Sequence, residues 1–285
     1  MIALFIECEH SEIEKKRPEL GDEYIVEMKG ISKRFGAVQA LNNVNLELRK
    51  NEILGLVGDN AAGKSTLMKI LAGAYTPDSG EIFLEGKPIQ LEGPRHAREL
   101  GITMVYQDLA LFNSMDVASN IFVAREPTTN VLGVKLFDRK EMRERARALL
   151  EKMKVNISSV DLPVARMSGG QRQMIAAARA LAFEAKILLL DEPTAALGVR
   201  EANTLLNQIK EWKAHGLSII LITQRIPDVL AVGDRVMVLK GGARQDILDV
   251  ASCHLDDIVN LIIKGREDLQ NSGGEKPNLE FLSFG

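Results

Sequence analysis

The fold is decided by residues 58–66, which read Gly58-Asp59-Asn60-Ala61-Ala62-Gly63-Lys64-Ser65-Thr66. This stretch fits the phosphate-binding pattern G-x-x-x-x-G-K-[ST] without a substitution. An apolar run of strand length, residues 53–57, precedes it, and apolar residues at helical spacing follow it. The small residues let the backbone curl, so that successive N–H groups face phosphate oxygens at a helix N-terminus. The stretch therefore predicts a strand, a phosphate loop and a helix in that order.

Within this loop the pattern assigns two chemical roles. Lys64 is expected to reach the β- and γ-phosphates of a nucleotide, and the Ser65 hydroxyl is expected to bind magnesium. The alternative is a surface turn that matches the pattern by chance. Because the strand and the helix flank the loop as the pattern requires, the phosphate-binding interpretation is favoured.

Composition and charge narrow the class of protein. The chain has 285 residues, 46% of them hydrophobic, and a net charge of −3, which fits a globular protein and gives no general reason to bind nucleic acid. No apolar run reaches the roughly 18–20 residues of a membrane span, and the apolar start lacks the basic segment of a signal peptide. Cys8 and Cys253 lack metal-like spacing and are expected to be free thiols in the cytosol. The four histidines form no cluster.

Strand-like and helix-like runs alternate along most of the chain. This order predicts an α/β fold with a mainly parallel central sheet. We expect a weakly ordered extension over residues 1–21, a folded domain over 22–265 and a loose tail over 266–285. Residues 108–165 are expected to form an inserted helical subdomain, with Asp138 capping a helix that runs to about Met153.

Two carboxylates follow the apolar run of residues 187–190. A buried strand would carry Asp191 and Glu192 to its C-terminal end, where ligands bind in such sheets. Asp191 suits the shell of a magnesium ion, and Glu192 suits the polarisation of an attacking water. A core strand that ends in solvated acids is the alternative, and the phosphate loop elsewhere in the chain favours the functional interpretation.

A third motif is Met167-Ser168-Gly169-Gly170-Gln171. Ser168 is a good N-cap for a helix that continues to about Leu181. A Ser-Gly-Gly start leaves N–H groups free to bind an anion, although an ordinary capped helix has the same appearance.

The order of the phosphate loop, Gln107, Met167–Gln171 and Asp191-Glu192 resembles the nucleotide-binding domain of ABC transporters. The resemblance covers roughly residues 22–265. It implies a RecA-like P-loop NTPase core with an N-terminal antiparallel β subdomain and the helical insert. It also implies that two domains pair head to tail. ATP and magnesium on one phosphate loop would then be covered by the signature residues of the facing subunit, which are Ser168, Gly169 and Gly170.

The resemblance assigns further residues. Phe35 stands where an aromatic ring stacks on adenine, although its neighbours alone are also compatible with a core aromatic. Gln107 matches a loop glutamine that contacts magnesium and water and senses the membrane partner. The phrases at residues 120–127 and 191–199 look like those of simple-sugar importers. Many such relatives carry two fused nucleotide domains, so this chain would act as a homodimer or beside a second ATP-binding subunit.

The chain departs from the family pattern at a few positions. Met167 stands where the family usually has leucine, and Gly198 stands where many members have aspartate, although importers of simple sugars commonly have glycine there. Gln224 occupies the place of a histidine that contacts the γ-phosphate. A glutamine can donate a hydrogen bond but carries no positive charge, so we expect it to take part in catalysis but to slow hydrolysis.

The resemblance implies an ATP-driven motor at the cytoplasmic face of the cell membrane. Its partners would be an integral-membrane permease and, indirectly, a periplasmic or extracellular sugar-binding protein, with no nucleic acid. The alternatives are a soluble ABC ATPase of translation or DNA repair and a regulatory subunit with little ATPase activity. The insert between Gln107 and Ser168 is short, as in importers, whereas repair and translation factors typically have tandem domains or long coiled coils.

Overall fold

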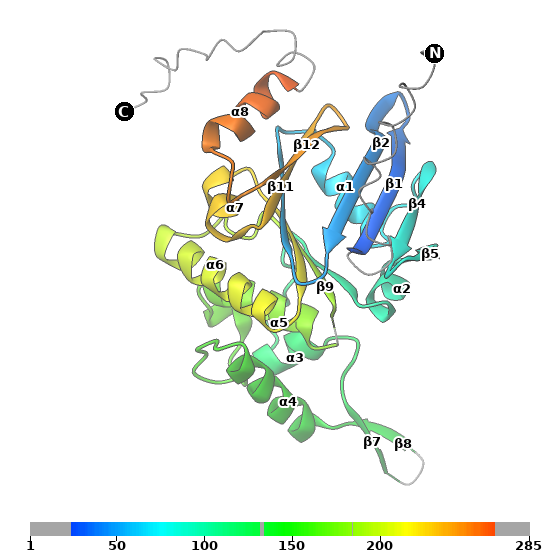
Figure 1. Ribbon diagram of the computed structural model, residues 1–285. Coiled ribbons are helices and arrows are strands. Elements are labelled where there is room, and N and C mark those ends of the chain that lie inside the picture. The colour runs from blue at the N-terminus through cyan, green and yellow to red at the C-terminus, as the bar shows by residue number, and fades with distance from the viewer. Residues whose placement is uncertain (1–23, 132–133, 184, 266–285) are drawn as a thin grey trace, which may run out of the picture.

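The computed structural model describes residues 24–131, 134–183 and 185–265. The expected extension, the expected tail and Cys8 lie outside these residues. Two sheets stand side by side, and helices cover the free face of the larger one (Figure 1). The helical segment lies at one end of the molecule, and helix α8 lies at the opposite end (Figure 1).

The larger sheet has six strands, and four neighbouring pairs within it are parallel. Only its edge strand β12 pairs antiparallel. This arrangement confirms the predicted α/β fold with a mainly parallel sheet. In spatial order the strands are β12 (Ala243–Asp249), β11 (Arg235–Lys240), β3 (Ile53–Gly58), β10 (Ser218–Ile222), β9 (Ile187–Asp191) and β6 (Ile102–Val105).

Both faces of the larger sheet are buried. In β9, Leu188 and Leu190 pack into the core on the helical face, whereas Ile187 and Leu189 pack into the core on the other face. This double burial explains the continuous apolar runs in the sequence, because a strand with one wet face would alternate. The helical face is covered by α5 (Gly169–Leu181), α6 (Val199–Ala214), α7 (Ile226–Val232) and α8 (Leu255–Ile263).

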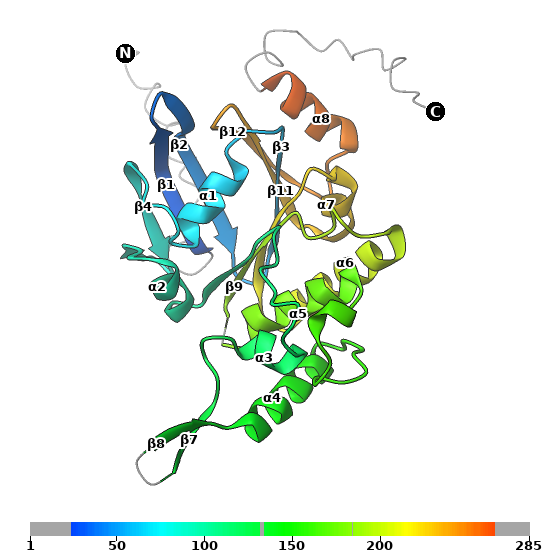
Figure 2. The same cartoon turned by 180° about the vertical axis from the view of Figure 1, so that it is seen from behind.

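The smaller sheet is antiparallel, as the resemblance implied. Helix α1 (Lys64–Leu71) packs between the two sheets through Leu67, Met68, Ile70 and Leu71, as Figure 2 shows from behind. The phosphate loop therefore starts on one sheet and leads into a helix that is held by both. In spatial order the smaller sheet has β2 (Val38–Arg49), β1 (Tyr24–Phe35), β4 (Ser79–Leu84) and β5 (Lys87–Ile89).

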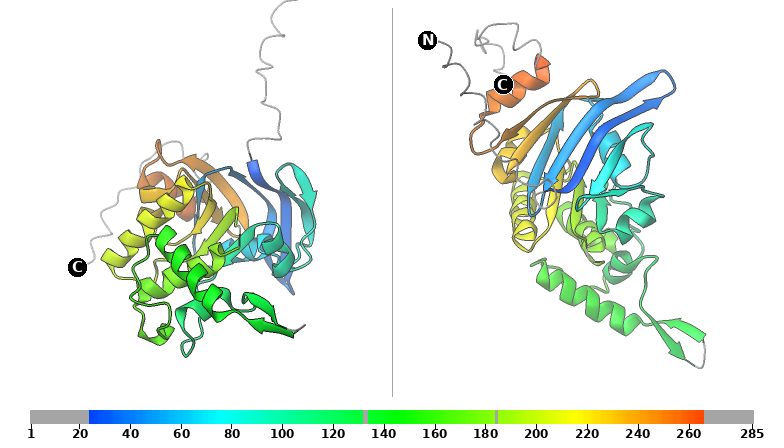
Figure 3. Two further views of the ribbon diagram at one scale, coloured as in Figure 1. Left: turned by 90° about the horizontal axis from the view of Figure 1, so that it is seen from below. Right: turned by 45° about the vertical axis from the view of Figure 1, so that its right-hand side comes forward.

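Residues 108–165 contain the helix expected after Asp138, which is α4 (Arg139–Lys152), and a second helix, α3 (Val117–Phe122). The Asp138 side chain accepts from the Glu141 N–H at 2.9 Å, so the predicted N-cap is confirmed. The prediction of helix fails at a hairpin, in which β7 (Thr128–Val131) pairs with β8 (Val134–Phe137). The hairpin projects beyond α4 (Figure 3). Strands of four residues are too short for their alternation to stand out in a sequence.

Other elements were also absent from the sequence prediction. They include the short helices α2 (Pro94–Glu99) and α7, the short strand β5 and the edge strand β12. Prolines begin both helices, Pro94 in α2 and Pro227 in α7, and the helices are only six and seven residues long. An isolated helix of that length has no stability of its own, so its sequence signal is weak and packing decides the outcome.

Candidate functional site

The candidate site lies at the C-terminal ends of three neighbouring parallel strands. β3 leads into the phosphate loop, β9 ends at Asp191, and β10 ends just before Thr223. The register places Ile222 opposite both Leu56 and Asp191. The sheet therefore brings together the phosphate loop, the two acids and the segment of Gln224, which are far apart in the sequence.

The phosphate loop has little space around its glycines. Gly63 has a φ of +100°, and a Cβ at this position would lie 2.6 Å from the Ala40 carbonyl oxygen. Any larger residue would meet both backbone strain and a clash with main-chain atoms. Ala61 also has a positive φ, of 65°. The loop thus curls as the small residues in its sequence predicted.

Lys64 begins α1 and is only 7% exposed. Its ammonium donates to the carbonyl oxygens of Gly58 and Asp59, each at 2.8 Å. Burial lowers the pKa of Lys64, and the nearby carboxylates, led by Glu192, partly oppose that change. The ammonium therefore sits inside the loop, where it is poorly solvated and directed at main-chain oxygens.

Asp191 is buried at the end of β9, with 7% of its surface exposed. The Ser65 hydroxyl lies near enough to its carboxylate to act on it as a hydrogen-bond donor. Burial raises the pKa of Asp191, whereas this donor and the charges of Lys69 and Lys64 act in the opposite direction. The predicted magnesium ligands Ser65 and Asp191 thus lie near each other.

Glu192 has a left-handed backbone with φ of +50°, which is uncommon for a residue other than glycine. Its N–H donates to the Ile222 carbonyl oxygen at 2.9 Å, which ties the residue to β10. Burial raises the pKa of Glu192, while the hydrogen bond from the Gln224 N–H acts against that change. Strained residues of this kind cluster at functional sites.

Gln224 reaches the phosphate loop. Its side-chain amide donates from Nε2 to Asn60 Oδ1 at 2.8 Å, and its main-chain N–H bonds the Glu192 carboxylate. Gln224 thus lies between Glu192, the candidate general base, and the phosphate loop.

Gln107, Gly169 and Glu192 line one cavity of about 400 Å³. Ser168 caps α5 as predicted, and it forms a capping box with Gln171 in which the Ser168 Oγ accepts at 3.2 Å. The hydrogen bonds of Ser168 stay at the start of its own helix. They do not join the signature motif to the phosphate loop of the same chain.

Phe35, at the end of β1, is 43% exposed, so it is not a core aromatic. Its ring meets that of Tyr75 edge-on, with 5.3 Å between the centroids. Tyr75 was not predictable from the sequence as a neighbour of Phe35, because a single aromatic after a helix has no distinctive spacing.

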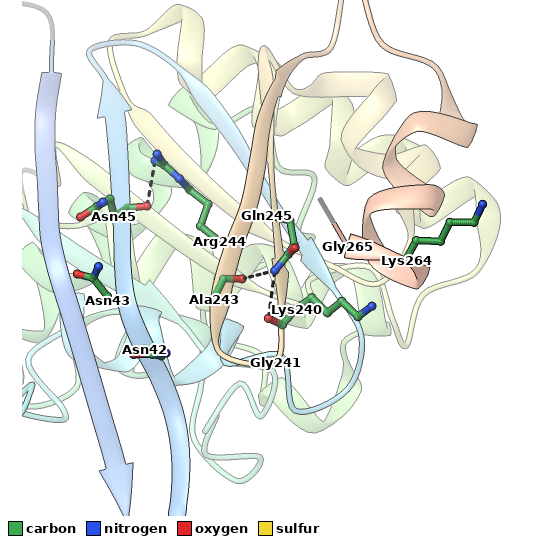
Figure 4. Close-up of a pocket in the computed structure, with 10 residues that line it drawn as sticks. All are labelled: Asn42, Asn43, Asn45, Lys240, Gly241, Ala243, Arg244, Gln245, Lys264 and Gly265. Carbon is green, nitrogen blue, oxygen red and sulfur yellow. Dashed lines mark hydrogen bonds between the residues drawn. The ribbon is translucent and has the colours of Figure 1, made fainter. Parts of the chain in front are cut away.

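A second cavity, of about 760 Å³, lies between β2, the β11–β12 turn and the end of α8 (Figure 4). Two of the basic side chains that line this cavity have partners within the protein. The Lys240 ammonium donates to the Ile263 carbonyl oxygen at 2.6 Å, and Arg244 pairs with Glu47 at 2.9 Å. This cavity is lined by none of the phosphate-loop residues, the two acids or Gln224, so it is not the candidate nucleotide site.

A family model described as ABC transporter matches residues 41–195. This chain belongs to the ABC transporter family. The resemblance drawn from its motifs is confirmed, and the chain is an ATPase of this family. Its fold is similar to a crystal structure of an ATP-binding cassette of an ABC transporter in its ADP conformation. That comparison has a TM-score of 0.73 and 25% identity, and covers 88% of this chain and 99% of the other.

Two relatives of this ABC protein cover most of its length. It is 43% identical over 218 residues to the xylose/arabinose import ATP-binding protein XylG of Sulfolobus acidocaldarius, which covers 76% of this chain and 85% of the relative. It is 41% identical to the fructose import ATP-binding protein FrcA of Rhizobium meliloti, over 87% of this chain and 97% of the relative. The xylose import ATP-binding protein XylG of Brucella abortus is 39% identical over 86% of this chain, which spans 47% of that relative.

Within residues 24–131, 134–183 and 185–265, no helix is both long enough and apolar enough to cross a bilayer.

Proposed function

We propose that this chain is the ATP-binding subunit of an importer for a simple sugar. The observation that carries the proposal is its 41% identity to a fructose import ATP-binding protein over 97% of that protein's length. The chain would pair with a second copy or with another ATP-binding subunit. It would work at the cytoplasmic face of the membrane, beneath a permease that receives sugar from a periplasmic or extracellular binding protein.

In this proposal, separate groups of the chain bind the phosphates and the base of the nucleotide. Lys64 and the loop N–H groups hold the phosphates, and Phe35 stacks on the base through its exposed ring. Ser168, Gly169 and Gly170 contact the phosphates bound to the facing subunit. The exposed position of Ser168 and Gly169 supports this, because a group that serves a second copy has to lie on the surface.

The donor atoms at the site suit magnesium. Ser65 and Asp191 lie near each other, and Gln107 can add an amide oxygen, so the set consists of hard oxygen ligands. Few protein ligands are expected, because Mg²⁺ in such sites keeps waters and binds phosphate oxygens. Bound magnesium would neutralise charge on the phosphates.

Glu192 would accept a proton from the attacking water, with Gln107 orienting that water from the same cavity. Gln224 would donate a hydrogen bond toward the γ-phosphate, where the family usually has a histidine. The contact of Gln224 with Asn60 supports this, because it places the amide at the phosphate loop.

The function is tested by affinity purification of the tagged chain from its own cells, followed by ATP binding and dimerisation assays. We expect a small apolar permease to come down with it, and Mg-ATP to shift the chain from monomer to dimer. Recovery of ribosomes or DNA without a permease would favour a translation or repair ATPase. A chain that stays monomeric with saturating Mg-ATP and the membrane components present would overturn the proposal.

The first prediction concerns Gln224. Replacing it with histidine should speed ATP hydrolysis, by up to about 10²-fold, because a charge-stabilising contact at the γ-phosphate is restored. Steady-state phosphate release measures the change. Gln90→His, which adds the same imidazole at an exposed position after β5, should leave the rate unaltered. A rate for Gln224→His equal to that of the parent would show that glutamine serves adequately.

The second prediction concerns pH. Burial raises the pKa of Glu192 above its ordinary value of 4.5, so its base form is lost at a higher pH than for an exposed glutamate. As pH falls, kcat/KM should therefore decline before the ordinary glutamate range is reached. The free energy of unfolding should change in the opposite direction. A carboxyl group whose pKa is raised by folding binds a proton more readily in the folded state, so the free energy of unfolding increases as pH falls through that pKa.

A pH series of kcat/KM on the parent and on Gln224→His separates the groups involved. The parent should show an acidic limb from carboxylates alone, and the histidine variant should add a limb near the usual histidine pKa of about 6.5. A parent profile that stays flat down to the ordinary glutamate range would contradict the role given to Glu192.

A further inference from the structure

A buried polar pair lies behind the candidate site. The Thr194 hydroxyl donates to the Asp228 carboxylate at 2.5 Å, and the two residues are 1% and 4% exposed. A hydrogen bond to a carboxylate in such surroundings is charge-assisted and shorter than most. Thr194 follows Glu192 by two residues, whereas Asp228 lies in α7, so the bond joins two segments that flank the site.

On one side, Thr194 belongs to the turn that carries Glu192. The Ala195 N–H donates to the Glu192 carbonyl oxygen at 3.2 Å, and the Leu197 N–H donates to the Thr194 carbonyl oxygen at 3.1 Å. A glutamate with a left-handed backbone conformation persists only where the surrounding structure fixes that conformation. The bond from Thr194 is a side-chain anchor of this turn, and it is directed away from the solvent.

On the other side, Asp228 belongs to the helix that follows Gln224. That helix sits directly on the strand of the phosphate loop, because a Cβ at Gly55 would lie 2.2 Å from Cγ1 of Val229. Asp228 therefore has a fixed position relative to β3, and the Arg225 guanidinium lies 3.5 Å from it. Through Asp228 and α7, the turn that carries Glu192 is held against β3, the strand that leads into the phosphate loop.

We propose that Thr194 and Asp228 are a positioning pair, which fixes the Glu192 carboxylate relative to Gln224 and the phosphate loop. The proposal rests on the proposed ATPase role of Glu192. Both side chains are almost completely buried, so the pair acts through the residues that it holds. Its effect is on the placement of the base, and a misplacement of about 1 Å can cost on the order of 10²-fold in rate.

The test compares Thr194→Val with Thr194→Ser in single-turnover hydrolysis of Mg-ATP. Valine keeps the shape and removes the donor, so we expect the rate constant to fall about 10- to 100-fold while the affinity for ATP changes less than about twofold. Serine keeps the hydroxyl and should retain most of the rate. Asp228→Asn added to Thr194→Val should lower the rate little further, because the hydroxyl that Asp228 accepts from is already gone and only the ion pair with Arg225 remains to be lost.

Ser218→Ala is the matched control. Ser218 is 1% exposed on β10, and its Oγ accepts from the Asn51 N–H at 2.9 Å, at the end of the strand opposite the site. The control should lower the melting temperature without changing the rate constant. Amide hydrogen exchange of residues 192–198 in the nucleotide-free protein should speed up in Thr194→Val and stay unchanged in Ser218→Ala.

Two outcomes would overturn the positioning role. One is a rate constant for Thr194→Val within about twofold of the parent, and the other is equal loss of rate in Thr194→Val and Ser218→Ala. A parent protein without any Mg-ATP hydrolysis would instead count against the proposed function. The two failures are therefore distinguishable.

Discussion

Glu192→Gln should lower the rate of ATP hydrolysis by about 10²- to 10⁴-fold and leave nucleotide binding nearly unchanged. The carboxylate lies in a cavity with Gln107, and its pKa is raised by burial, which brings it closer to the range in which a general base works best. Glutamine has the same shape but cannot accept the proton. The carboxylate also accepts the Gln224 N–H, and the amide oxygen of glutamine can take over that bond.

The same variant should accumulate as an ATP-bound dimer. If nucleotide closes two copies and hydrolysis opens them, then blocking the chemical step leaves the closed state populated. Phosphate release measures the rate, and size-exclusion chromatography with Mg-ATP measures the dimer. Glu211→Gln, at a partly exposed position on α6 that pairs with Lys154, should match the parent in both assays. Hydrolysis by Glu192→Gln within tenfold of the parent rate would remove Glu192 as the base.

Much of the fold was predictable because its central strands are buried on both faces. The runs at residues 53–57 and 187–190 are apolar without a break, so their type and order could be read from the sequence. The phosphate loop was predictable for a different reason. Its curled backbone requires small residues, and Lys64 follows them at the fixed spacing of the pattern. The helix caps Ser168 and Asp138 were also predictable, because each side chain accepts a hydrogen bond from an N–H only three residues further along the chain.

The parts that could not be predicted depend on contacts between distant segments. Thr194 and Asp228 are 34 residues apart, and nothing in either neighbourhood specifies the other. The bond between Gln224 and Asn60 joins residues 164 positions apart and exists because β3 and β10 are neighbours. Helix α7 was missed for the same reason, because it is a helix by virtue of its packing on Gly55. Sequence motifs thus predicted the groups that we propose bind phosphate, whereas the groups that we propose position them became visible only in the folded topology.

Lys64→Met should lower the affinity for Mg-ATP roughly 100-fold, and hydrolysis should fall with it. The ammonium is buried and lies beside the carbonyl oxygens of Gly58 and Asp59, so a phosphate that enters the loop meets a poorly hydrated positive charge. A charge-assisted hydrogen bond in such a place contributes more than one in water. Methionine fills a similar length without the charge, so the loss reports the ammonium and not a cavity.

The carboxylates near Lys64 make this loss larger. Glu192, Asp59 and Asp191 all stabilise the charged form of the lysine, and without it their negative charges would face the triphosphate uncompensated. Fluorescent-nucleotide titration measures the affinity, and a thermal melt without nucleotide checks that the variant is folded. Lys69→Met, five residues along α1, is the control: its ammonium lies 5.7 Å from the Tyr75 ring, so it should weaken ATP binding far less. Equal affinity losses in the two variants would show that general positive charge, and not the placement of Lys64 in the loop, holds the phosphates.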